Sequence, residues 1–201
     1  LAVDNTFLSM FSFPLLAGDG NNALSQPNTT MLSEKLARKL LSNNASPEEL
    51  IGKMVNIEND SLPYKVTGIF KTVPENSHLQ FDFLLSYVSL YSGGNGQWAT
   101  ADHDFTQSDF WHYIQLKPGV NPKALNAKLA DFGKRHFQGN KISGSDEVIY
   151  LQPLAKAHLA TDLEYDFIKK GNPATVWGLL IIAVFTIGIA WVNYINLATA
   201  R

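Results

Sequence analysis

The sequence contains no cysteine, and this absence excludes several kinds of protein chemistry. A chain of 201 residues without cysteine has no disulfide, no thiol nucleophile and no zinc site built on thiolates. It also has little net charge, −2 at neutral pH, so its composition gives no reason to expect nucleic acid as a partner. These absences leave the cellular compartment open.

Charge is missing altogether from one long part of the chain. All 18 acidic residues and 15 of the 16 Lys and Arg residues lie in residues 1–170, and only Arg201 follows them. Residues 171–200 are therefore uncharged, and most of them from Val176 onward are apolar. At about 1.5 Å per residue, the helix that they would form is long enough to cross a hydrocarbon core of about 30 Å.

We therefore predict one transmembrane helix within residues 171–201. Asn172 is a good N-cap, and Pro173 suits the first helical position. Aromatic residues stand near both ends of the apolar stretch, as expected of side chains at the two membrane interfaces; they are Trp177, Trp191 and Tyr194. Asn193 and Asn196 either face partner helices or lie in the headgroup layer.

The sequence patterns before this stretch predict a mixed domain of helices and strands. Leu32, Leu36 and Leu40 recur at helical spacing and predict a helix after a short strand. A capping box, Ser46 with Glu49, predicts a short helix that Gly52 ends. The pattern also predicts strands at residues 54–58, 64–73 and 79–85.

Residues 109–154 read as strand, helix and strand. The alternation in residues 110–117 predicts a strand, Asn121 and Pro122 begin a helix, and residues 147–154 predict a second strand. We interpret this order as half of a split β-α-β lobe, which makes the fold class α+β.

Motifs that carry chemistry are scarce. The sequence has no GxxxxGK[ST] phosphate loop, no HExxH and no GxSxG. Glycines at 93–96 favour a loop over a phosphate cradle. A metal site at Asp102–Asp104 with His112 is conceivable, but neighbouring side chains of an extended segment point to opposite sides, which favours a solvated loop.

Three other histidines have structural interpretations. We expect His78 to bond locally to a turn and His136 to lie in or beside a core, while His158 has no partner visible in the sequence. We therefore predict no catalytic, cofactor-binding or metal-binding residue and no cofactor, and expect that the chain is not an enzyme.

Several stretches, taken in order, resemble a known family. They are FLSMFSFPLLAGD, LSEKLARKLL, the segment from LIGKMVNIEN to PENSHLQFDFLLS, LQPLAKAHL, and the terminal WVNYINLATAR. This order is similar to that of MacB/FtsX-like ABC transporter permeases, and the detail VPENSH followed by FDF resembles versions common in Bacteroidota. The resemblance covers nearly the whole chain and is weakest at residues 91–108.

The resemblance implies an architecture. It implies a two-lobed extracytoplasmic domain followed by one transmembrane helix. Residues 1–10 and 106–170 would form a membrane-proximal β-α-β lobe, residues 11–105 an inserted α/β lobe, and residues 171–201 the helix. Residues before Leu1 would complete the proximal lobe.

The resemblance also implies a function. The domain would transmit ATP-driven motion across the bacterial inner membrane to periplasmic cargo or partner proteins, in efflux or export, with residues 1–170 on the periplasmic side. Its expected partners are an ABC ATPase subunit or domain that binds the ATP, a second permease copy and a periplasmic adaptor or cargo.

Two other interpretations of the function remain open. A ligand-sensing extracytoplasmic domain of a membrane-bound signalling receptor would have the same coarse pattern, a mixed α/β domain and one span. A membrane-anchored hydrolase would need a convergent catalytic group, and none is visible in the sequence.

Overall fold

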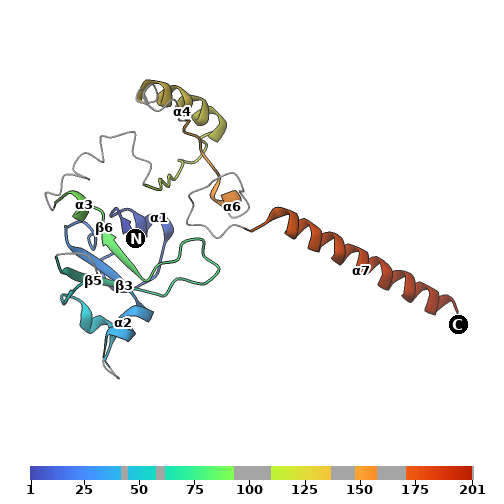
Figure 1. Cartoon of the computed structure of the whole chain (residues 1–201), viewed down its shortest axis with the longest axis horizontal. Helices are drawn as coiled ribbons and strands as arrows, with labels where there is room; N and C mark the ends of the chain where they lie inside the picture. Colours follow the sequence, from blue (N-terminus) through green and yellow to red (C-terminus); the bar gives the residue numbers. More distant parts are fainter. Residues whose placement is uncertain (42–44, 58–61, 93–109, 137–147, 158–170, 201) are drawn as a thin grey trace. The chain divides into compact units, whose positions relative to one another are not determined.

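The computed structural model describes residues 1–41, 45–57, 62–92, 110–136, 148–157 and 171–200 (Figure 1). The chain divides into two compact units, Leu1–Tyr150 and Leu151–Arg201. Each unit is described by itself below.

The first unit is built around a mixed sheet of six strands. Its order is β1 (Ala2–Val3), β6 (Phe83–Ser86), β3 (Thr29–Ser33), β5 (Tyr64–Phe70) and β2 (Leu15–Gly18), with β4 (Met54–Val55) also paired to β5. The central strand β3 runs parallel to β5 and antiparallel to β6. All five residues of β3 are buried, which identifies this strand as the middle of the core.

Alternation along β3 sends successive side chains into two separate apolar clusters. Met31 belongs to the cluster that includes Phe7, Phe70 and Leu84. Leu32 belongs to the cluster on which α2 (Glu34–Leu40) packs through Ala37. Both faces of the sheet are therefore covered.

Local capping explains where the first helices begin. The Ser33 hydroxyl accepts a hydrogen bond of 3.1 Å from the Leu36 N–H, so the last residue of β3 is also the N-cap of α2. The short 3-10 helix η1 (Pro47–Leu50) has the predicted capping contact, a 3.0 Å bond from the Ser46 N–H to Glu49. Both predicted helices are confirmed.

The other helices in the described part of this unit are α1 (Phe7–Phe11), α3 (Ser89–Ser92) and α4 (Pro122–His136). Helix α4 confirms the helix predicted from Pro122. Its Leu125, Leu129 and Phe132 are half-buried on one face, as the helical spacing predicted, whereas His136 at its end is exposed.

The predictions of strands in residues 110–117 and 147–154 are wrong for the residues that the structure describes. No strand is present in residues 110–117 or 148–153, the part of these segments that is described. Alternation fixes which side chains share a face, but a strand also needs a neighbouring backbone to pair with. Strands β5 and β6 exist but are shorter than predicted, because β5 ends earlier, at Phe70, and β6 begins later, at Phe83.

Residues 1–10 lie in the sheet unit. Strand β1 pairs in parallel with β6, and Phe7 and Leu8 of α1 are buried in the first cluster. The family resemblance implies that residues 1–10 form one lobe with residues 106–170. The predicted boundary near residue 105 falls in residues 93–109, outside the described part, so the two-lobe division stays a prediction.

The second unit contains α6 (Leu154–Ala157) and α7 (Pro173–Thr199). Helix α7 has 27 residues and begins at the predicted Pro173.

We predict that Gly18→Ala destabilises the sheet unit more than Gly52→Ala. Both glycines have a positive φ, 97° and 85°, which costs an alanine about 1–2 kcal/mol. A Cβ at Gly18 would also clash with the Thr67 carbonyl oxygen, whereas a Cβ at Gly52 would have no described atom within 4 Å. Denaturant titration should show the larger loss of unfolding free energy for Gly18→Ala. Equal losses would contradict the close packing of β2 on β5.

Candidate functional site

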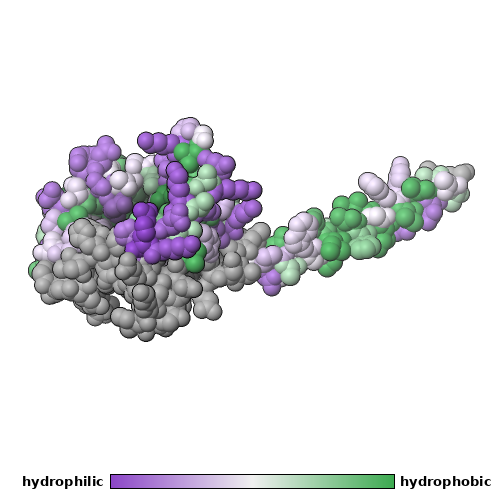
Figure 2. All heavy atoms as spheres, turned by 90° about the horizontal axis from the view of Figure 1, so that it is seen from above, coloured by the Kyte–Doolittle hydropathy of each residue, from purple (hydrophilic) through white to green (hydrophobic). Residues whose placement is uncertain are grey.

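Helix α7 has the dimensions of a membrane span. Its 27 residues extend about 40 Å at 1.5 Å per residue, and its most apolar window has a mean hydropathy of 2.3. None of that window is buried inside the structure, which distinguishes α7 from the core helix of a globular domain. Figure 2 shows apolar side chains along most of this helix.

Three polar side chains of the α7 segment, Asn172, Thr186 and Thr199, form hydrogen bonds with the backbone of the helix. The Asn172 side chain accepts a 2.9 Å bond from the Ala174 N–H, which confirms the predicted cap. The Thr186 and Thr199 hydroxyls donate to the carbonyls of Ile182 and Ile195, each at 2.9 Å. Such bonds remove the cost of placing a hydroxyl in an apolar solvent.

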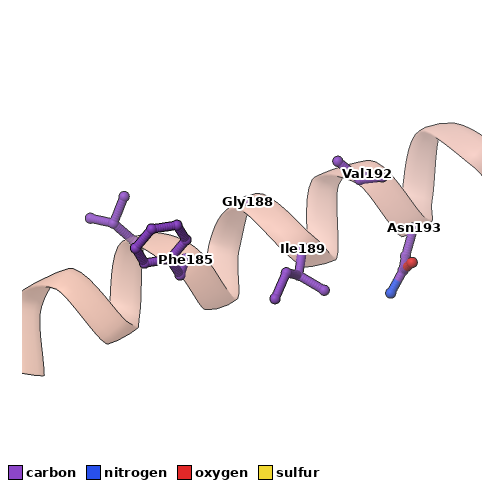
Figure 3. Close-up of a pocket in the computed structure, with 6 residues that line it drawn as sticks. Phe185, Gly188, Ile189, Val192 and Asn193 are labelled. Carbon is purple, nitrogen blue, oxygen red and sulfur yellow. The ribbon is translucent and has the colours of Figure 1, made fainter.

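One side of α7 is hollowed at Gly188. An open groove of about 470 Å³ is lined by Val184, Phe185, Gly188, Ile189, Val192 and Asn193. Figure 3 shows that Gly188 carries no side chain between the bulky Phe185 and Val192, while Asn193 contributes the polar group. No described atom lies within 4 Å of a Cβ at Gly188, so the described residues of α7 leave this groove open.

An aromatic cluster holds distant parts of the first unit together. Phe11 of α1 lies edge-on to Tyr113, with ring centroids 5.0 Å apart, and Phe13 lies edge-on to Phe81 at 5.2 Å. Phe7 contacts both Phe11 and Phe81. We made no prediction of this cluster from the sequence, although residues 7–13 contain three phenylalanines, which were the available signal.

The structure describes three histidines, His78, His112 and His136, and two of them lie against aromatic rings. His78 lies beside the rings of Phe11 and Tyr113, with centroids 6.2 and 5.9 Å away, and so belongs to the aromatic cluster. His136 stacks on Phe132 at 4.2 Å, and His112 is exposed. In the described part of the chain, no three His, Asp or Glu residues are grouped so that they could hold a metal ion.

The other candidates in the sequence lie outside the described residues. They are the glycines at 93–96, Asp102–Asp104 with His103, and His158.

Hydrogen bonds within a turn lower the pKa of the Asp19 carboxyl group. The Asn22 side chain and the Asn21 N–H donate to Asp19, at 2.8 and 3.0 Å, and these bonds lower the pKa of its carboxyl group. Asp19 is exposed, and its bonds stay within residues 19–22, so we assign it to the turn after β2.

The sequence profile of the MacB-like periplasmic core domain family matches residues 1–132. The chain belongs to this family. The resemblance drawn from the sequence is thereby confirmed, and so is its coarse functional meaning, a MacB-like periplasmic core domain of a permease-type protein in the context of membrane-associated ABC transporters.

Two solved structures are similar to this MacB-like chain. A domain assigned to a permease protein of Porphyromonas gingivalis is 24% identical, with a TM-score of 0.50 over 77% of this chain and 68% of that one. This likeness supports the fold of the mixed α/β sheet domain. In this chain an apolar helix that could span a membrane follows that domain. The periplasmic region of MacB from Actinobacillus actinomycetemcomitans is 12% identical, with a TM-score of 0.41. The chain matches 58% of that region with 74% of its own length. No curated protein matches the chain significantly.

We predict that Ile187→Arg prevents stable insertion of α7. Ile187 lies near the middle of the helix, where an arginine costs about 3 kcal/mol in membrane insertion. Thr199→Arg is the matched control, because an arginine at the helix end reaches the headgroup layer. The measurement is the fraction of protein that stays with membranes after alkaline carbonate extraction. Equal fractions for the two variants would contradict the prediction that Ile187 lies in the apolar middle of the bilayer.

Proposed function

We propose that this chain is the extracytoplasmic domain and one membrane span of an ABC transporter permease subunit in the bacterial inner membrane. In this proposal residues 1–170 lie on the periplasmic side and transmit ATP-driven motion to periplasmic cargo or partner proteins, in efflux or export. The observation that carries it is the family match over residues 1–132 together with the unburied apolar helix α7 that follows.

The form of α7 supports a mechanical role. Its only proline is Pro173 at the first position, so no proline interrupts the helix between there and Thr199. A continuous helix resists bending because each turn is fixed by its hydrogen bonds to the next. A displacement at one membrane surface would therefore reach the other surface without being absorbed by a hinge inside the helix.

Each proposed partner has a separate role in transport. An ABC ATPase subunit or domain binds and hydrolyses ATP, a second permease copy completes the membrane assembly, and a periplasmic adaptor or cargo receives the motion. The groove at Gly188 supports contact with another span, since small residues let helix backbones approach closely in membranes.

We also propose that the chain is not an enzyme and leaves nucleotide chemistry to its partner. This rests on the absence of a phosphate loop in the sequence. Calorimetry on the purified chain should detect no ATP binding in the micromolar range, and no ATP hydrolysis should accompany it. Tight ATP binding by the chain alone would contradict this division of work.

We predict that Gly188→Phe reduces ATP-coupled activity of the assembled permease. No atom of the described residues lies within 4 Å of a Cβ at Gly188, so we expect the effect to come from a neighbouring helix that the ring displaces. Leu179→Phe is the control, because at about 100° per residue Leu179 lies on the opposite side of α7. The measurement is transport and stimulated ATPase activity of the reconstituted permease with its ATPase.

Two outcomes would count against the proposal. Unchanged transport and ATPase stimulation in Gly188→Phe would remove the packing role of this face. Finding that α7 leads into a kinase or cyclase, with no associated ATPase, would favour the receptor reading.

A further inference from the structure

Charge is distributed unequally along the chain. Residues 1–105 carry eleven acidic and six basic side chains, whereas residues 106–170 carry seven acidic and nine basic ones. The excess of basic over acidic residues therefore lies in residues 106–170, which directly precede the membrane helix.

Helix α4 concentrates that surplus on one side. We call its exposed cationic residues the basic face; they are Lys123, Lys128, Lys134 and Arg135. At about 100° per residue they fall within an arc of about 140°, opposite the half-buried apolar residues of the helix. Asp131 is the single acidic residue of α4. The basic face therefore has a charge of +3 after Asp131 is counted.

The lysines of this face are not used within the described structure. The ion pair found among the described residues joins Arg38 to Glu34 of α2, and none involves Lys123, Lys128 or Lys134. Unpaired exposed lysines contribute little to folding, so their clustering is not explained by stability of the domain.

We propose that the basic face of α4 binds the anionic phospholipid headgroups of the same membrane that α7 crosses. The inference rests on the proposed function, because it requires α7 in a bilayer. Chain connectivity favours it, since α4 ends at His136 and α7 begins at Pro173, so the bilayer remains at a high effective concentration. Lys169 and Lys170 add two further cations just before the span.

The chemistry of the face also favours a lipid surface over a protein. A lysine acts as a flexible point charge and suits a diffuse layer of phosphates, whereas specific recognition of a carboxylate favours the rigid fork of arginine. Trp111, before α4 in the sequence, and Tyr150, after it, are exposed and are of the residue types found at membrane interfaces.

The absence of native cysteine allows a direct test on the full chain. A single fluorophore on Ala127→Cys, which is exposed between Lys123 and Lys134 on the helix, reports contact with a headgroup-linked quencher in nanodiscs. We expect quenching in discs that contain phosphatidylglycerol and little in discs of phosphatidylcholine alone. Raising the salt from 0.1 M to 1 M should abolish it, because the Debye length falls from about 10 Å to about 3 Å.

A charge variant and a matched control separate this contact from general electrostatics. Lys123→Gln with Lys128→Gln and Lys134→Gln should lower the ratio of bound to free α4 on the order of 100-fold, from roughly fivefold per lysine. The control removes the same charge from exposed lysines of the sheet unit, through Lys35→Gln, Lys39→Gln and Lys53→Gln, and should leave quenching unchanged.

A second label keeps the two proposals apart. A fluorophore on Phe185→Cys in α7 should be quenched by acyl-chain quenchers in either disc. If it is not, the span is wrong and the proposed function fails. If it is, while Ala127 is unquenched or indifferent to lipid charge, salt and the triple variant, the lipid contact is wrong. Loss of a co-purifying acidic protein from the triple variant, without any lipid contact, would assign the basic face to that protein instead.

Discussion

The structure of the first unit depends on the burial of β3 on both faces. Only a strand in the middle of a sheet can place Met31 in one cluster and Leu32 in the other, and both are almost fully buried. Because β3 is parallel to β5, the chain must cross from the end of one to the start of the other, and α2 and η1 make that crossing over the second cluster. The cap at Ser33 couples the end of the strand to the start of the helix.

The membrane helix obeys a different constraint. In water, α7 would expose a row of large apolar side chains that the described residues do not cover, whereas in a bilayer this uncharged surface is favourably solvated and the helix satisfies its interior backbone groups. The same solvent makes close packing, rather than apolar burial, the means by which α7 could bind another helix. This is why a glycine, and not a large apolar residue, marks the side of α7 that we propose for contact.

The sequence predicted those parts of the structure whose causes are local. The absence of charge after residue 170 identified α7, and single caps at Ser46, Asn172 and Asn121 identified the starts of helices. Residues 110–117 were different, because their alternation was a local signal for a feature that depends on a distant partner strand. Tyr113 shows where that segment is held instead: against Phe11, more than a hundred residues earlier in the chain. No local sequence pattern predicts a contact between residues so far apart in the chain.

The candidate site was harder to predict than the fold for a reason that follows from the proposed mechanism. Catalysis gathers convergent polar groups, and such groups leave motifs. Transmission of motion needs continuity of a helix, a face on which another helix can pack and a fixed relation to the membrane surface. Each is a property of many residues of ordinary type, such as the uninterrupted run after Pro173 or the cations of α4. The order of segments along the chain, rather than any single residue, therefore carried the functional signal.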